Sequence, residues 1–214
     1  MKTYSQTFGT KNISIGISGI IGVGKSTLTN FLGKKLEFEQ YYEPVESNKY
    51  LEKFYGDMNK YAFPMQIYLL NHRFKQHQQM VWSNKNVVQD RTIYEDVIFA
   101  KMLWDSKLMD DDDFSTYVDL FNNMTNFLHR PDLIIYLDVE PEEALRRINN
   151  RSRTCEHSIS LEYLKALKEG YEDWLSDISP RIPVLRIDWN EFRDTEFVIE
   201  EINKTLEIRK GLVV

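Results

Sequence analysis

The sequence contains one cysteine, Cys155, among 214 residues. A lone thiol cannot form an internal disulfide, so we expect the chain to work in a reducing, intracellular compartment. Long hydrophobic runs are also lacking. The longest weakly polar stretch, residues 13–24, is interrupted by serines and glycines, and it is shorter than the roughly 20 apolar residues that span a bilayer. The sequence therefore predicts neither an internal disulfide nor a transmembrane helix.

A surplus of positive charge is absent as well, because 27 Lys and Arg residues face 33 Asp and Glu residues, for a net charge of -6 and a pI near 5.3. Binding to nucleic acids or anionic membranes depends on surplus Lys and Arg, so neither partner is expected. The first eleven residues, MKTYSQTFGTK, lack the apolar core of a signal peptide and the arginines of a mitochondrial presequence. We interpret them as a short polar lead-in and predict a cytoplasmic protein.

What is present is an alternation of β-branched runs and amphipathic stretches. With 42% hydrophobic residues, and with no internal repeat or Pro/Ser/Gly linker, the chain is predicted to form one domain over residues 1–214. Short apolar runs predict strands at residues 13–18, 86–90, 132–138 and 183–188, with a fifth over 36–43. Runs this apolar suit strands buried on both faces. The predicted fold class is α/β, with a five-stranded parallel sheet and helices on both faces.

Between these runs, apolar residues recur at helical spacing. The stripes are Leu28, Phe31, Leu32 and Leu36; Phe63, Ile67, Leu70, Phe74 and Val81; Leu161, Leu164, Leu167, Tyr171 and Trp174; and Val198, Ile199, Ile202 and Leu206. A further helix is expected to begin near Pro141, because acidic residues follow it at once and arginines come later, which complements the helix dipole.

The strongest chemical signal is the string GIIGVGKST over residues 19–27, which fits G-x-x-x-x-G-K-[ST] and lies between a predicted strand and a predicted helix. In such a P-loop, backbone N–H groups turn toward a triphosphate, Lys25 reaches its terminal phosphates and Ser26 can bind Mg²⁺. A glycine-rich turn with a chance lysine is the alternative, which this context disfavours. The predicted ATP-binding residues here are Gly19, Gly22, Gly24, Lys25, Ser26 and Thr27.

The rest of the chain favours a small-molecule kinase over a GTPase. No predicted strand ends in the D-x-x-G of a switch GTPase, and the string NKN at residues 84–86 lacks the aspartate of a guanine-binding motif. The strand at 86–90 instead leads into DRT, at the edge of the sheet where ligands gather. Asp90 can hold Mg²⁺ or orient a substrate hydroxyl, and Arg91 can neutralise charge on the transferring phosphoryl group. An ordinary structural salt bridge is the alternative.

Glu43 is the candidate general base. A hydroxyl that attacks a γ-phosphate needs a proton acceptor near its line of approach, and a carboxylate at a strand end beside the P-loop can supply one. Taken alone, Glu43 could equally be a solvated loop glutamate.

Gln66 and Arg73 are two polar residues that could line a pocket. They lie two helical turns apart and share a face, displaced modestly from the apolar stripe of the same predicted helix. Glutamine offers a donor and an acceptor side by side, and Arg73 could pair with Asp96. The alternative is a pair of polar residues on a solvent-facing helix edge.

At this point the sequence resembles a known family, the deoxyribonucleoside kinases, and it looks most similar to the bacterial and mycoplasma-type deoxyadenosine/deoxyguanosine kinases. The resemblance spans nearly the whole chain and rests on five ordered motifs: GIIGVGKST, EPVESNKYLEKFY, FPMQIYLLNHRFKQ, DRTIYEDVIFAK and RSRTCEHSISLEYL. It implies a P-loop kinase fold with an Arg-rich lid, and a homodimer.

The resemblance also implies a role for individual residues. Glu43 is then the base toward the sugar 5′-hydroxyl, and Asp90 and Arg91 are the acid and arginine of the family's Glu/Asp-Arg-Ser/Thr motif. Contacts to the 3′-hydroxyl fall on Tyr55 and Glu156, base recognition on Gln66, Arg73 and Asp96, and base stacking on Phe99. Residues 188–192, DWNEF, are similar to the loop that holds the adenine of ATP, through Asp188, Asn190 and Phe192. Trp189 or Phe192 could line that site, or either could pack in the core.

The predicted lid spans about residues 150–160. Four arginines lie in it or just before it. Arg151 and Arg153 match the lid arginines that reach the ATP phosphates, whereas Arg146 and Arg147 could do no more than complement a helix end. Closure of such a lid would exclude water and suppress hydrolysis of ATP.

The sequence therefore predicts transfer of the γ-phosphoryl group of MgATP to the 5′-hydroxyl of a deoxyribonucleoside, in nucleotide salvage. An Arg and an Asp at positions 73 and 96 resemble members that take deoxyadenosine, deoxyguanosine or deoxycytidine, and EDVIFAK favours the purines. Two alternatives are a nucleoside monophosphate kinase of the thymidylate kinase type, which would need Arg73 for the acceptor phosphate, and a catalytically silent nucleotide-binding regulator.

Overall fold

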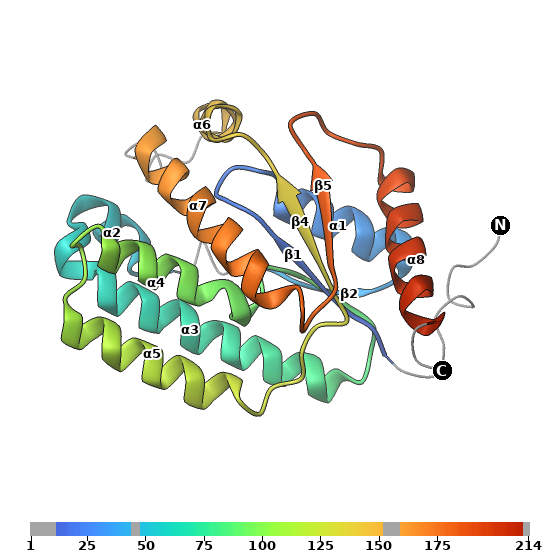
Figure 1. The fold of residues 1–214 in the computed structure, drawn as a ribbon, viewed down its shortest axis with the longest axis horizontal. Helices are drawn as coiled ribbons and strands as arrows, with labels where there is room; N and C mark the ends of the chain where they lie inside the picture. Colours follow the sequence, from blue (N-terminus) through green and yellow to red (C-terminus); the bar gives the residue numbers. More distant parts are fainter. Residues whose placement is uncertain (1–11, 44–47, 152–158, 212–214) are drawn as a thin grey trace.

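The computed structural model describes residues 12–43, 48–151 and 159–211. Five parallel strands form one sheet in the order β2-β3-β1-β4-β5 (Figure 1). Their bounds are β1 Ser14–Ser18, β2 Glu39–Tyr41, β3 Val87–Asp90, β4 Leu133–Asp138 and β5 Val184–Asp188. The prediction of a five-stranded parallel sheet is confirmed.

Helices cover both faces of this sheet, as predicted. On one side lie α1 and α8, and on the other α4 and α7 with α3, while α5 packs against α3 and α4 (Figure 1). The bounds are α1 Lys25–Leu36, α2 Leu51–Gly56, α3 Met58–Ser83, α4 Asp96–Asp105, α5 Asp111–Thr125, α6 Pro141–Asn150, α7 Leu161–Ile178 and α8 Thr195–Gly211, with a short 3-10 helix at Ile93–Glu95. Within the described ranges, no helix combines the length and the apolar character needed to cross a bilayer.

The central strands are buried on both faces, which explains why they read as continuous apolar runs. Neighbouring residues along β4, such as Ile134 and Ile135, are fully buried although their side chains point to opposite faces. The predicted strand bounds hold to within a residue except for β2, expected over 36–43. There α1 continues through Leu36, and Glu37 takes a left-handed conformation (φ 58°), so the strand begins only at Glu39.

Two of the predicted apolar stripes need correction. Phe31 on α1 and Val81 on α3 are exposed rather than packed. The buried face of α3 instead carries Ala62, Met65, Gln66, Leu69, Leu70, Arg73, His77 and Met80. Gln66 and Arg73 therefore lie on the buried face of α3, and not beside it as predicted. Polar residues can occupy this face because it borders a pocket that they line.

The strand order places the carboxyl ends of β1 and β3 side by side. Ile17 pairs with Asp90, and Tyr41 of β2 pairs with Gln89 in the next position across the sheet. Three loops, those after β1, β2 and β3, thus open at the same edge, near the point where the chain switches sides of β1. Open α/β sheets bind their ligands at such a switch point.

Candidate active site

The loop between β1 and α1 has the conformation of a phosphate-binding loop. Gly22 and Gly24 have φ of +89° and +97°, a region that side chains rarely adopt, and a Cβ on Gly22 would lie 2.7 Å from the carbonyl oxygen of Ala144. The buried Lys25 crosses the inside of the loop, where its Nζ donates to the carbonyls of Gly19 (3.1 Å) and Ile20 (2.8 Å). The loop glycines and Lys25 therefore build the cradle that the motif predicts.

Lys25 loses much of its solvation in this position. Burial, and secondarily the nearby Arg91, lower the pKa of Lys25 to about 7. An anionic ligand in the loop would restore the charge of the ammonium group, because an opposite charge favours the protonated form.

Ser26 and Asp90 come together as predicted for a metal pair. The Ser26 hydroxyl donates to Oδ2 of Asp90. Burial raises the pKa of Asp90, while Lys25 opposes that rise. The second carboxylate oxygen, Oδ1, is buried and has no hydrogen-bond partner among the described residues.

The donor set at Ser26 and Asp90 suits Mg²⁺. Its two groups are oxygens, which Mg²⁺ prefers, and the buried Oδ1 of Asp90 still needs a partner. In the described parts of the chain no three His, Cys, Asp or Glu side chains gather into an all-protein metal cage. An ion bound at Ser26 and Asp90 would take its other ligands from nucleotide phosphates and water.

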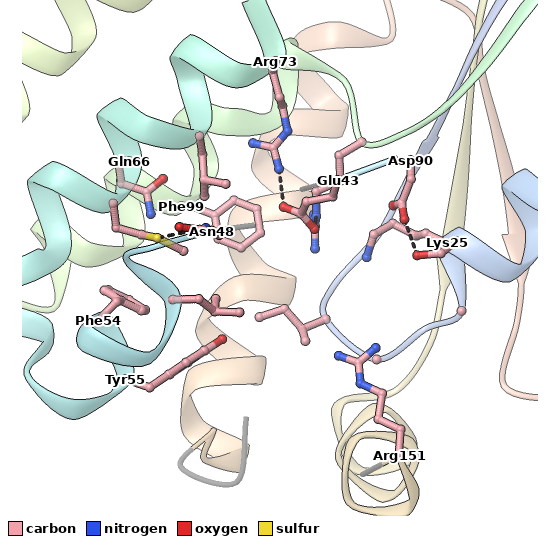
Figure 2. Close-up of a pocket in the computed structure, with 18 of the residues that line it drawn as sticks. Lys25, Glu43, Asn48, Phe54, Tyr55, Gln66, Arg73, Asp90, Phe99 and Arg151 are labelled. Carbon is pink, nitrogen blue, oxygen red and sulfur yellow. Dashed lines mark hydrogen bonds and ion pairs between the residues drawn. The ribbon is translucent and has the colours of Figure 1, made fainter. Parts of the chain in front are cut away.

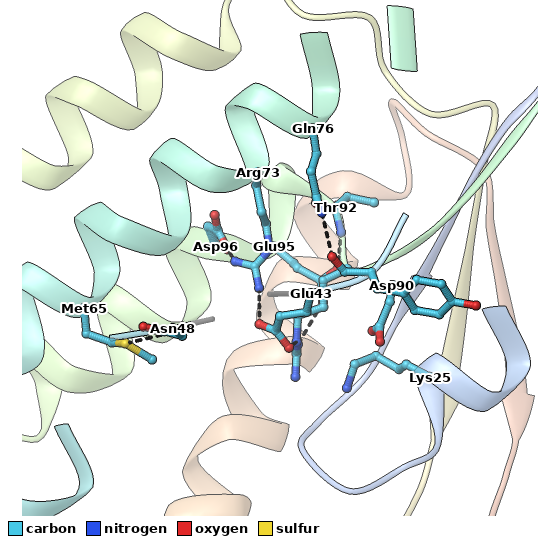
Figure 3. Close-up of polar contacts among 12 residues, drawn as sticks. Lys25, Glu43, Asn48, Met65, Arg73, Gln76, Asp90, Thr92, Glu95 and Asp96 are labelled. Carbon is cyan, nitrogen blue, oxygen red and sulfur yellow. Dashed lines mark hydrogen bonds and ion pairs between the residues drawn. The ribbon is translucent and has the colours of Figure 1, made fainter. Parts of the chain in front are cut away.

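Glu43 is paired with two buried arginines, Arg73 and Arg91, and Figure 3 shows Arg73 beside it. Arg73 Nη2 donates to Oε1 of Glu43 at 2.5 Å, and Arg91 Nε lies 3.4 Å from Oε2. Arg73 is also paired with the buried Asp96. Burial would raise the pKa of Glu43, but the charges of Arg91 and Arg73 outweigh it, so the pKa lies below its usual value.

A cavity of about 300 Å³ adjoins these groups, a size within the range of small-molecule sites. Figure 2 shows Tyr55 and Gln66 on one side, Lys25 and Asp90 on the other, and Glu43 between them. The apolar part of the lining is formed by Leu51, Phe54, Met65, Leu69 and Phe99. The pocket therefore has a phosphate end and an apolar end, with a carboxylate at their junction.

Most of the predicted site residues meet in this one cavity. It is lined by Gly22, Gly24, Lys25, Ser26, Thr27, Glu43, Tyr55, Gln66, Arg73, Asp90, Arg91, Phe99 and Arg151. Gly19 and Asp96 do not line it, but they contact Lys25 and Arg73, which do. Arg153 and Glu156 fall outside the described residues, so their roles stay predictions, as does the lid.

The 188–192 loop lies beside the P-loop rather than in the cavity lining. Its Asp188 and Asn190 are engaged locally: Asp188 Oδ1 accepts from Asn190 Nδ2 (3.0 Å), and Asn190 Oδ1 accepts from the backbone N–H of Glu140 (2.9 Å). Of the two aromatic residues, Trp189 is buried, whereas Phe192 is 65% exposed. Phe192 is thus the aromatic side chain at which a ligand could stack.

Arg147 connects this loop to the P-loop. Its Nη2 donates to the carbonyls of Trp189 and Asn190, both at 2.8 Å, and its Nη1 donates to that of Val23 at 3.2 Å. The guanidinium also lies 4.3 Å from the centre of the Phe192 ring. Arg147 therefore does more than complement a helix end, whereas the exposed Arg146 pairs with Glu143 on its own helix.

Sequence reasoning missed several residues of the site, among them most of its apolar lining and three polar side chains. Tyr163 on α7 lines the cavity, and Glu95 and Tyr171 contact Arg91. The spacing of Arg91 and Glu95 by four was a signal for their ion pair. The apolar stripe of α7 predicted that Tyr171 is buried, but no local pattern indicated that Tyr171 or Tyr163 reaches the site, because the tertiary fold brings α7 there.

Comparison with known proteins agrees with this arrangement. A family model described as deoxynucleoside kinase matches residues 15–209. Deoxyadenosine kinase of Dictyostelium discoideum is 54% identical over 90% of this chain and 79% of its own length. Deoxyadenosine/deoxycytidine kinase of Bacillus subtilis (strain 168) is 42% identical over 90% of both chains.

A solved structure extends the comparison to the fold. Deoxyadenosine kinase from M. mycoides, with the products dCMP and a flexible dCDP bound, superposes with a TM-score of 0.82 at 37% identity, over 91% of this chain and 99% of that one. The predicted resemblance, the fold and the enzyme class are confirmed together: the chain belongs to the deoxynucleoside kinase family.

Proposed function

We propose that this chain transfers the γ-phosphoryl group of MgATP to the 5′-hydroxyl of a deoxyribonucleoside and prefers purine nucleosides. The observation that carries the proposal is the position of Glu43, at the junction between the phosphate cradle and the apolar end of a cavity large enough for a nucleoside. A nucleoside with its base at the apolar end would present its 5′-hydroxyl near Glu43.

In this reaction Glu43 accepts the proton of the 5′-hydroxyl as the new P–O bond forms, the bond from the γ-phosphorus to the bridging oxygen breaks and ADP leaves. Its lowered pKa keeps it ionised at neutral pH. Phosphoryl transfer needs mainly positioning and charge stabilisation, so an acceptor of low basicity suffices. Lys25 and Arg91 stand on the phosphate side and stabilise the charge on the transferring group.

Ser26 and Asp90 would hold the Mg²⁺ of MgATP. The ion neutralises charge on the phosphates when it is bound. Arg151 lines the same end of the cavity and would contact the phosphates, while the exposed Phe192 beside Gly24 offers a stacking surface for the adenine.

Gln66 and Arg73 would form hydrogen bonds with the base. Tyr55 would contact the sugar 3′-hydroxyl, and Phe99 would stack on the base. Arg73 is already paired with two carboxylates, Asp96 and Glu43. This pairing argues against a monophosphate kinase, since that activity would need the charge of Arg73 for the acceptor phosphate. The product dCMP in the structure of the M. mycoides enzyme keeps deoxycytidine among the candidate substrates.

Three further predictions accompany this proposal: a single domain, a homodimer and a cytoplasmic location. Light scattering coupled to size-exclusion chromatography tests the dimer, since a mass near 25.5 kDa would identify a monomer instead. Limited proteolysis tests whether the chain is a single domain, and cell fractionation tests the cytoplasmic location.

The decisive experiment is ATP-dependent phosphorylation of deoxyadenosine, deoxyguanosine, deoxycytidine, thymidine and their monophosphates, with Glu43→Gln and the exposed control Glu207→Gln. We expect turnover of purine deoxynucleosides that falls at least about 100-fold in Glu43→Gln and is unchanged in Glu207→Gln. Activity on monophosphates alone would assign the alternative kinase class, and ATP binding without transfer would assign a regulator.

A further inference from the structure

Behind Arg91 lies a carboxylate that the proposed chemistry does not use. Glu95 is fully buried. Its Oε1 accepts from the Ser18 hydroxyl and from the Thr92 N–H, both at 2.8 Å, while its Oε2 lies 3.2 Å from Arg91 Nη1 and accepts from the Tyr171 hydroxyl. Figure 3 shows Glu95 and Thr92 near the group formed by Glu43, Arg73 and Asp96. Both oxygens of Glu95 are thus satisfied, as a buried carboxylate requires.

Tyr171 closes this network from α7. Its hydroxyl accepts from Arg91 Nη1 and donates to Glu95. Burial raises the pKa of Tyr171 well above its ordinary value, so the hydroxyl keeps the proton that it donates to Glu95. Arg91, Glu95 and Tyr171 therefore form a closed triangle of hydrogen bonds inside the protein.

The triangle occupies Nη1 of Arg91, a residue that lines the cavity. Nη1 is held by Glu95 and Tyr171, Nε lies 3.4 Å from Glu43, and the Phe99 ring centre is 4.7 Å from the guanidinium carbon. No hydrogen bond to Nη2 occurs among the described residues. Nη2 is therefore the nitrogen that a phosphoryl oxygen could bind.

The backbone of Arg91 has a conformation that the surrounding structure must stabilise. Its φ of 67° is left-handed, a conformation that is unfavourable for a residue with a Cβ. A long arginine side chain loses further entropy when it is fixed. Such a side chain holds one direction only if the surrounding structure determines it.

We propose that Glu95 and Tyr171 are positioning residues, which hold Nη1 of Arg91 so that its Nη2 is directed toward the transferring phosphoryl group, and that Glu95 also supplies a permanent counter-charge. This inference rests on the proposed kinase reaction. Because Glu95 balances Arg91, Glu43 is not the sole counter-ion of that arginine and stays available to accept the substrate proton. Fixed charges stabilise a transition state more than charges that must first reorient.

A purely structural role is the competing explanation, since Glu95 also takes part in a capping box with Thr92. Tyr171→Phe separates the two, because it leaves Glu95 and the cap in place and removes only the hydroxyl. Tyr136→Phe is the matched control: Tyr136 is equally buried, and its ring centre lies 5.6 Å from that of Tyr171. Glu95→Gln, which keeps the shape but removes the charge, is the second variant.

We expect kcat to fall at least about tenfold in Tyr171→Phe, and further in Glu95→Gln, with KM for the nucleoside within about threefold of wild type. In Glu95→Gln the acid limb of the pH–rate profile should move to lower pH, because Arg91 then has one carboxylate fewer to balance it and its charge lowers the pKa of Glu43 further. Tyr136→Phe should leave kcat and the profile unchanged. Equal kcat in Tyr171→Phe and Tyr136→Phe would overturn the proposal.

A readout without turnover keeps this test distinct from that of the kinase reaction. The Nε–H signal of Arg91, assigned by its loss in Arg91→Lys, should exchange slowly with solvent in wild type and in Tyr136→Phe. It should exchange at least about tenfold faster in Tyr171→Phe, whereas the Arg73 signal stays protected. If wild type phosphorylates no nucleoside, the proposed function fails by itself. If Arg91 stays protected in Tyr171→Phe, the positioning inference fails.

Discussion

The Ser26 hydroxyl donates a hydrogen bond to the carboxylate of Asp90, although the two residues lie 64 positions apart. Parallel pairing of β1 with β3 creates this contact, since it brings the end of β3 beside the P-loop. Two oxygen-bearing groups thereby meet where the phosphates of a nucleotide would lie.

Asp90→Asn should weaken the use of Mg²⁺. We expect the Mg²⁺ concentration for half-maximal activity to rise about tenfold and kcat to fall, because a neutral amide is a poorer ligand for a hard cation. Activity measured against free Mg²⁺ at saturating ATP checks this. Asp105→Asn, at an exposed residue paired with Lys101, should match wild type. An unchanged Mg²⁺ requirement in Asp90→Asn would remove Asp90 from the metal site.

Binding of MgATP should take up protons at pH 8. The pKa of Lys25 is lowered to about 7 by burial and by Arg91, so the free side chain is mostly neutral at that pH. Phosphates favour the ammonium form, hence the sign is uptake. Calorimetry in buffers of different ionisation enthalpy measures it. Lys85→Met, at an exposed residue, should keep the uptake. Proton release, or none at all, would contradict the shifted pKa of Lys25.

Asp96→Asn should destabilise the fold and relax base selectivity. It removes one of the two carboxylates that balance Arg73, the one in an almost fully buried pair, and the loss of such a charge costs about 3 kcal/mol. Urea unfolding gives the free energy, and competition between deoxyadenosine and thymidine gives the selectivity. Glu172→Gln breaks a surface pair with Arg186 and should cost less than about 1 kcal/mol. Equal effects of the two variants would contradict a special role for Asp96.

Phe192→Ala should raise KM for ATP about five- to tenfold and leave KM for the nucleoside unchanged. The ring is exposed beside Gly24 and stacks with Arg147, so it can contribute about 1 kcal/mol to an adenine. Steady-state kinetics with each substrate varied in turn separates the two constants. Phe197→Ala removes a comparably exposed ring from α8 and should change neither. A rise in the KM for the nucleoside, with the KM for ATP unchanged, would show that Phe192 does not contribute to the ATP site.

By itself, the sequence determined the features that depend on short stretches of chain. The strand pattern, the P-loop and the start of α6 at Pro141 follow from local periodicity, glycine placement and helix-end charges. These properties depend on residues a few positions apart, so a single segment contains all the information needed to predict its local structure.

Only the tertiary structure decided which side chains face one another. Periodicity says that Gln66 and Arg73 share a face of α3, but not that this face is buried, or that Phe31 and Val81 are left exposed. Arg73 meets Glu43 across 30 positions of sequence, and Arg91 meets Tyr171 across 80. Such contacts depend on how whole helices pack against the sheet, and no local pattern records that packing.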